Sequence, residues 1–161
     1  MSREKLSDSH LDRWTPEACS LFEEATSLRD QRQLVQARDV ANRALNALRA
    51  DQQLARGAVM REIGHTHYLV DDFESALPWF VSARDASERS ELSSLCVFHT
   101  LFDLGRLGEA LMEALRFSGI KASAEYLEMF SIGFIDGLPE RNHCAATQVR
   151  AKFLALQRGE K

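Results

Sequence analysis

The histidines and cysteines are the residues with which this chain could bind a metal ion, and their spacing shows whether a metal site is possible. His65 and His67 are two positions apart, so on a helix they point to different faces. Cys96 and His99 are three apart and can share a face, but no second pair accompanies them. Zinc sites gather ligands through patterns such as paired C-x-x-C or H-E-x-x-H, and neither occurs. We therefore predict no metal and no other cofactor, and we expect His67 to be a core residue.

Catalytic groups are equally hard to assemble from this sequence. It contains no G-x-S-x-G turn and no glycine-rich phosphate loop. Two pairs of adjacent carboxylates occur, at Glu23-Glu24 and at Asp71-Asp72. Neighbouring carboxylates on a helix diverge, and the second pair is typical of a turn. We expect the chain not to be an enzyme.

Composition restricts the partners and the location of the chain. Its 161 residues carry a formal net charge of −4, and no long basic run indicates contact with nucleic acid. No stretch approaches the roughly 20 apolar residues that cross a bilayer, so we expect no membrane contact. The N-terminus is polar, unlike a signal peptide, and the 3 scattered cysteines do not form a disulfide framework. We expect a cytoplasmic protein.

Apolar residues recur every three or four positions almost throughout, which is the helical period. We predict an all-α chain of about eight helices, at residues 16–30, 34–49, 53–70, 73–87, 91–104, 107–117, 123–135 and 138–157. Thr15, followed by Pro16 and Glu17, marks the start of the first helix. We expect a single helical domain at residues 14–157, between a polar, flexible segment at 1–13 and a flexible tail at 158–161.

Small and aromatic residues recur at a fixed spacing in the middle of the chain. The best copy, at about residues 57–90, carries them at Gly64, Ala76, Phe80 and Ala83. Ala76 recurs 34 positions later as Ala110, and an earlier copy at about residues 18–50 is offset by 39 positions. This pattern resembles the tetratricopeptide repeat (TPR), a 34-residue unit of two antiparallel helices.

The copies also depart from the pattern of that family. Asp71 stands where the family has a turn glycine, Glu88 where it has a closing proline, and Phe98 where it has a small residue. The last part of the chain, from about residue 123 to 157, shows only the helical period. The resemblance implies a right-handed stack of antiparallel helix pairs, a TPR-like α-solenoid of three pairs plus a terminal pair.

The resemblance further implies where a partner binds, since the first helix of each pair lines the concave groove of such a stack. Carried over position by position, it assigns partner contacts to Phe22, Thr26, Arg29 and Asp30; to Arg61, His65, Tyr68 and Leu69; and to Leu95, His99, Phe102 and Asp103. This mixture is typical of peptide or helix capture through buried anchors with a polar rim. The family's clamp for a C-terminal carboxylate is not supported, because Arg61 and His65 occupy its leading places.

These features predict a non-catalytic protein–protein interaction module, an adaptor, chaperone or inhibitor that binds a protein or peptide. A small acidic chain also fits an immunity protein that neutralises a toxin, with fast and salt-sensitive association. A small-molecule-sensing or enzymatic helical domain is the alternative of another class, and it predicts a closed pocket and thermal stabilisation by a ligand. The groove and the apolar stretch at residues 130–134 also allow a homodimer.

Overall fold

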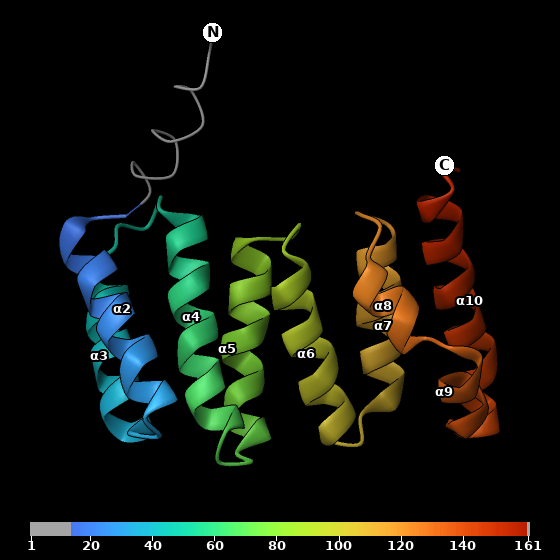
Figure 1. Cartoon of the computed structure of the whole chain (residues 1–161), viewed down its shortest axis with the longest axis horizontal. Coiled ribbons are helices and arrows are strands. Elements are labelled where there is room, and N and C mark those ends of the chain that lie inside the picture. The colour runs from blue at the N-terminus through green and yellow to red at the C-terminus, as the bar shows by residue number, and fades with distance from the viewer. Residues whose placement is uncertain (1–13, 161) are drawn as a thin grey trace, which may run out of the picture. The chain divides into compact units, whose positions relative to one another are not determined.

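The computed structural model describes residues 14–160, so the predicted flexible segment at 1–13 and the last residue of the predicted tail lie outside it. Within this part the chain forms nine α-helices and no strand, which confirms the all-α class (Figure 1). The helices are α2 (Pro16–Asp30), α3 (Leu34–Asn46), α4 (Gln53–Tyr68), α5 (Phe73–Ala86), α6 (Glu91–Asp103), α7 (Leu107–Ser118), α8 (Ala124–Met129), α9 (Ile132–Gly137) and α10 (Glu140–Gln157).

The helix predicted at residues 123–135 is instead two short helices, α8 and α9. Helical geometry ends at Phe130, whose ψ is 44°, and Ser131 has an extended backbone with φ −62° and ψ 160°. The side chain of Ser131 accepts a hydrogen bond from the N–H of Phe134 at 3.3 Å and so caps the start of α9. Serine favours such caps because its hydroxyl replaces a missing backbone acceptor. The apolar period continues across this break, and periodicity alone therefore missed it.

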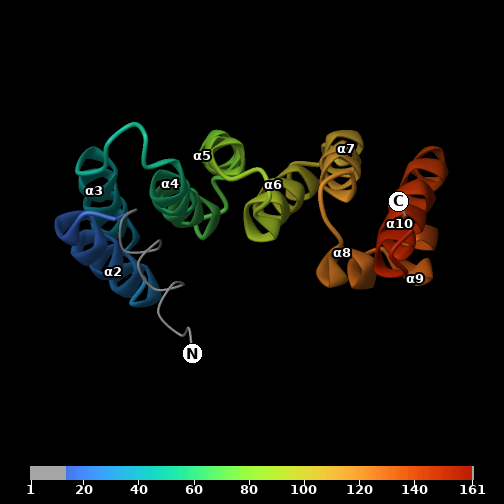
Figure 2. The ribbon, with the colours of Figure 1, turned by 90° about the horizontal axis from the view of Figure 1, so that it is seen from above.

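Residue contacts divide the chain into two compact units, with the boundary between Ser87 and Glu88. The first unit holds α2 to α5 and the second holds α6 to α10. In the first unit α2 packs against α3, and α4 packs against both α3 and α5 (Figures 1 and 2). The single domain expected from the sequence stays a prediction.

Small residues let α4 and α5 approach each other closely. A Cβ atom at Gly64 would lie 2.6 Å from Cε1 of Phe80, and one at Gly57 would lie 3.2 Å from the carbonyl oxygen of Ala83. Ala76 and Ala83 on α5 are fully buried. The packing of this pair therefore requires the small residues that the sequence repeats.

Turns of one geometry join the pairs α2–α3, α4–α5 and α6–α7. A residue with positive φ stands in each of them, at Arg32 (62°), Asp71 (58°) and Gly105 (71°). The next residue donates its N–H to the carbonyl oxygen five positions back, at 2.8–3.1 Å, as in the Schellman motif. The positive-φ residues are 39 and 34 positions apart, which are the two offsets found in the sequence. Asp71 thus adopts the conformation of the expected glycine, and the turn is kept.

His67, expected in the core, is a polar link at the end of α4, with 15% of its side chain exposed. Its Nδ1 lies 3.1 Å from the Asp72 carboxylate, and its Nε2 lies 3.2 Å from the guanidinium of Arg38. Asp72 also caps α5 by accepting from the N–H of Ser75. The imidazole therefore connects three helices by hydrogen bonds instead of filling the hydrophobic interior.

The second unit has an aromatic core. Here α10 packs against α7, α8 and α9 (Figure 1). The ring of Tyr126 lies 5.2 Å from Phe153, 5.6 Å from Phe98 and 5.8 Å from Phe117. All four residues are at most 1% exposed. Phe98, which replaces the family's small residue, therefore fills space at the centre of this unit.

Candidate partner-binding surfaces

All twelve residues assigned to partner contact lie on, or next to, the first helix of a predicted pair. Four lie on α2, three on α4 with Leu69 directly after it, and four on α6. The α2 and α4 sets belong to the first unit and the α6 set to the second.

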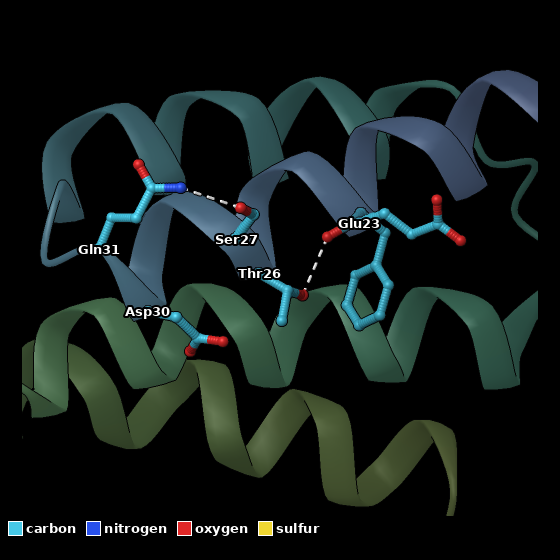
Figure 3. A pocket seen from close by; sticks show the side chains of 6 residues that line it. Glu23, Thr26, Ser27, Asp30 and Gln31 are labelled. Atoms are coloured by element: carbon cyan, nitrogen blue, oxygen red, sulfur yellow. Dashed lines mark hydrogen bonds between the residues drawn. The ribbon is translucent and has the colours of Figure 1, made fainter.

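The surface of α2 carries an open pocket of about 580 Å³. Its lining consists of one aromatic, two acidic and three neutral polar residues: Phe22, Glu23, Thr26, Ser27, Asp30 and Gln31. Figure 3 shows the polar members following one another along the helix, with Gln31 bonded to Ser27 at 3.0 Å. Three of the six were assigned to partner contact from the sequence, and the other three follow them on the neighbouring stripe of the helix.

The aromatic part of this surface extends toward the start of α2. Phe22 and Glu23 also line a depression of about 830 Å³ with Trp14 and Cys19 among its walls. The rings of Trp14 and Phe22 are 5.0 Å apart. The Cys19 thiol lies 3.8 Å from the Glu23 carboxylate. An apolar wall and an acidic side chain thus stand together at the place where the two hollows meet.

Arg29 links helices inside the first unit. Its Nη1 donates to Oε2 of Glu62 on α4 at 2.6 Å, and its Nη2 donates to Asp30 at 2.9 Å. Glu62 is only 4% exposed, and its Oε1 has no hydrogen-bond partner among the described residues. Burial raises the pKa of the Glu62 carboxyl, although the positive charge of Arg29 acts against this. Arg29 therefore neutralises chain carboxylates, a role that the sequence reasoning did not assign.

His65 is a half-buried ring on α4. Burial, together with the positive charges of Arg29 and Arg61, lowers its pKa to about 4. Its ring meets that of Phe80 edge-on, with centroids 5.1 Å apart. His65 is consequently uncharged at neutral pH and contributes an aromatic edge.

The other predicted residues of α4 differ in exposure. Tyr68 is half-buried, and its ring lies 5.1 Å from Phe73. Leu69 is 38% exposed. Arg61 is half-buried and lines a smaller pocket of about 250 Å³ with Leu54 and Ala58. Leu69 is thus the apolar side chain of this set that is most open to solvent.

The α6 set includes one buried residue and three exposed ones. Leu95 is 6% exposed, whereas His99 and Asp103 lie on the surface and Phe102 is 40% exposed. The exposed residues of this set therefore lie in the C-terminal half of α6.

Phe102 belongs to a closed ring of four phenylalanines in the second unit. Ring centroids are 6.2 Å apart for Phe98–Phe102, 6.0 Å for Phe102–Phe134, 5.4 Å for Phe134–Phe130 and 5.7 Å for Phe130–Phe98. Phe98 and Phe130 are buried, while Phe134 is half-buried and neighbouring Ile132 is 66% exposed. We call Phe102 and Phe134 the aromatic patch. The sequence signal for its α9 part was the apolar stretch at residues 130–134.

A buried polar network lies behind α6 and is complete. The Ser94 hydroxyl lies 2.6 Å from Oε1 of Glu113 and 2.9 Å from the Tyr126 hydroxyl. Arg116 binds both carboxylate oxygens of Glu113, at 2.6 and 2.9 Å. Burial raises the pKa of Tyr126. Because the polar groups of this network bond to one another inside the fold, we assign the network a structural role.

Two features of the described residues bear on the kind of site. Among residues 14–160 no group of three histidine, cysteine or acidic side chains has the geometry to hold a metal ion. In the same part of the chain no helix is both long and apolar enough to cross a membrane. No protein-family model matches the sequence, and a comparison with curated proteins finds no match. The TPR resemblance therefore depends on the residues of this chain alone.

Proposed function

We propose that this protein is a non-catalytic interaction module that binds a protein or peptide on the first helices of its pairs. The observation that carries the proposal is the pocket of about 580 Å³ on α2, which contains the predicted contacts Phe22, Thr26 and Asp30. Pockets that combine an apolar wall with a few polar groups are the usual form of a binding site. The repeated turns and their 39- and 34-residue spacing support the TPR-like stack, which remains part of the proposal.

The chemistry of this pocket favours a basic partner. Phe22 offers an aromatic face, and the exposed carboxylates of Glu23 and Asp30 flank it. Asp30 already pairs with Arg29, but both of these hydrogen bonds go to its Oδ1. An arginine or lysine side chain can stack on such a face while it pairs with a carboxylate. Arg29 is already engaged by Glu62 and Asp30, so pairing of a partner's carboxylates by Arg29 receives no support from its contacts.

The test uses a display library of random 12-residue peptides selected on the wild-type protein. Enriched peptides are then measured by fluorescence anisotropy against Glu23→Lys/Asp30→Lys. The matched control is Glu24→Lys/Asp39→Lys, which changes the net charge equally at two exposed positions outside the pocket. We expect about tenfold or greater weakening in the pocket variant and less than about twofold in the control.

Two results would contradict the proposal. In one, the library yields no peptide that binds the wild-type protein. In the other, both double variants bind every enriched peptide equally, although circular dichroism shows that both are folded. Either result would remove the pocket as a peptide site and leave the small-molecule alternative to be tested by thermal shift.

The exposed carboxylates also suit the alternative of an immunity protein with a basic toxin as its target. Association between oppositely charged proteins is fast at low salt and slows as salt rises, because the charges steer the encounter. A folded toxin would therefore show a steep salt dependence of its association rate, and its affinity would not be matched by any 12-residue peptide.

A further inference from the structure

We propose that Glu62, a buried residue of α4, is a positioning residue for the α2 pocket and makes that pocket selective for a cationic side chain of the partner. It acts through Arg29, which it binds and neutralises, on the pocket carboxylate of Asp30. This inference rests on the proposed function, since it concerns the partner chemistry of the same pocket. It involves residues of the first unit alone.

Three charged side chains form a continuous series from the interior of the first unit to the pocket. Nη1 of Arg29 donates to Oε2 of Glu62 at 2.6 Å. On its other edge, Nη2 and Nε of Arg29 donate to Oδ1 of Asp30, at 2.9 and 3.2 Å. The exposed fraction of the side chains rises along the series, from 4% for Glu62 through 24% for Arg29 to 66% for Asp30. The guanidinium is therefore held between a buried carboxylate and one that lines the pocket.

The charges of this series leave the pocket negative. Two carboxylates share one guanidinium, so the three groups together carry one negative charge when both acids are ionised. Oδ2 of Asp30 accepts no hydrogen bond within the described residues and is available to a partner's cation. The negative charge of Asp30 also acts at Glu62, where it adds to burial, the main cause, in raising the pKa of the carboxyl. Such coupling is reciprocal, so the charge of Glu62 likewise acts at Asp30.

Without the charge of Glu62, Arg29 would compete with the partner for Asp30. The guanidinium would then be balanced by Asp30 alone, and the pair would be neutral. Arginine pairs with carboxylates in a bidentate manner, so a guanidinium released from Glu62 would also cover Oδ2 of Asp30. Figure 3 shows Glu23 and Asp30 on opposite sides of Thr26, so Glu23 would attract a cation only at the other end of the pocket.

The test uses basic peptides selected on the wild-type protein from the library of random 12-residue peptides. Each is also made with citrulline for arginine or acetyl-lysine for lysine, which removes the charge at little change in shape. Glu62→Gln should weaken the basic peptides about fivefold at low salt, because it removes one unit of charge near the pocket. It should leave the neutral analogues within about twofold in fluorescence anisotropy. A loss of packing would instead weaken both kinds of peptide alike.

A second variant separates the charge of Glu62 from its place in the fold. Glu62→Gln/Arg29→Gln removes both charges of the buried pair and leaves Asp30 ionised, so binding of basic peptides should return to within about twofold of the wild type. The matched control is Glu113→Gln, which removes an equally buried, arginine-bonded carboxylate from the second unit. It changes the net charge equally and should leave both kinds of peptide within about twofold. Circular dichroism checks that each variant is folded.

A measurement on the wild type tests the inference even if Glu62→Gln disturbs folding. In NMR spectra of protein with isotope-labelled arginine, rotation of the Arg29 guanidinium about its Cζ–Nε bond should be slow, because the group is bonded on both edges. Arg32, which is exposed, is the reference for fast rotation. Equal rates for the two residues would mean that Glu62 does not hold Arg29 in solution, and would overturn the inference.

The binding results distinguish this inference from the proposed function. Peptides weakened by Glu23→Lys/Asp30→Lys but not by Glu62→Gln would leave the pocket intact and remove Glu62 from it. Equal weakening of basic and neutral peptides by Glu62→Gln would make Glu62 a purely structural residue. A double variant as weak as Glu62→Gln would exclude the charge of Arg29 as the cause. No peptide for the wild-type protein would remove both the inference and the proposed function.

Discussion

Each unit of this protein buries one glutamate against an arginine, and the two pairs differ in completeness. In the described residues Glu62 and Glu113 are both 4% exposed, and each has an arginine nitrogen 2.6 Å from its carboxylate. Glu113 has both oxygens bonded, by Arg116 and by the hydroxyl of Ser94. Glu62 has one oxygen bonded by Arg29, and its Oε1 has no partner.

The two pairs also differ in how far apart the glutamate and the arginine lie in the sequence. Arg116 is three residues from Glu113 on the same helix, so the helix itself holds the pair together. Arg29 lies 33 residues before Glu62, so that pair exists only when α2 and α4 are packed together. Buried polar networks rigidify a fold when every member is satisfied and remain weak points when one is not. The first unit, which carries the pocket, thus has the more adjustable polar interior.

Replacement of Glu113 should destabilise the protein most. Glu113→Ala removes three hydrogen bonds and leaves Ser94 and Tyr126 without their acidic neighbour in the core. Breaking a buried, hydrogen-bonded ion pair from one side typically costs about 3–5 kcal/mol. Because Arg116 is 31% exposed and can regain water, we expect about 3 kcal/mol from urea denaturation at pH 7.

Glu109→Ala serves as the control on the same helix. Glu109 is 59% exposed and pairs with Arg106, so its loss should destabilise the protein far less than the loss of Glu113. Equal losses for the two variants would show that the complete network contributes no more than a surface pair.

The second effect concerns pH in the first unit. The pKa of His65 falls from 6.5 to about 4 on folding. Between these pH values His65 binds a proton in the unfolded chain but not in the folded chain. The stability that this depressed pKa provides is present above pH 6.5 and is lost as pH falls from 6.5 to about 4. Each unit of pKa corresponds to about 1.4 kcal/mol, and partial exposure reduces the effect, so we expect about 2 kcal/mol.

His65→Phe tests this dependence because phenylalanine keeps an aromatic ring beside Phe80 and cannot titrate. Stability measured by urea denaturation at pH 7, 6, 5 and 4.5 should fall less in this variant than in the wild type. His99→Phe, at an exposed position of the second unit, should reproduce the wild-type slope. A slope unchanged by His65→Phe would mean that its imidazole is not desolvated in solution.

Local signals in the sequence were sufficient for most of the helices. The predicted start at Thr15 is confirmed, since its side chain accepts from the N–H of Ala18 at 3.1 Å. The small residues Ala76 and Ala83 are buried as the repeat pattern requires. A cap within an unbroken apolar pattern is a weaker signal, and for this reason the break before α9 was missed.

The buried glutamates could not be predicted in the same way. Glu62 follows Arg61, and together they resemble a charged surface pair. The burial of Glu62 depends on Arg29, and the burial of Glu113 involves Ser94, which is 19 residues away. Such partners are set by tertiary packing. For the candidate site, the stripe on α2 was predictable from helical spacing, but the internal role of Arg29 was not.

Glu62→Gln changes the incomplete pair with little change in shape, and of these variants it should alter stability least. Its amide oxygen can still accept from Arg29, and the substitution removes a buried negative charge, so we expect a loss of at most about 1 kcal/mol at pH 7.

The pH dependence of stability shows whether burial or the charge of Arg29 dominates at Glu62. Since burial raises the pKa of Glu62 above 4.5, its contribution is fully present below pH 4.5 and is lost as pH rises through the folded value. Glu62→Gln lacks this loss, and the wild type should therefore lose stability relative to it between pH 4.5 and 7, as measured by urea denaturation. A wild type that instead gains on the variant over this range would mean that the attraction of Arg29 exceeds the effect of burial, and that the pair in the first unit is as well stabilised as the one around Glu113.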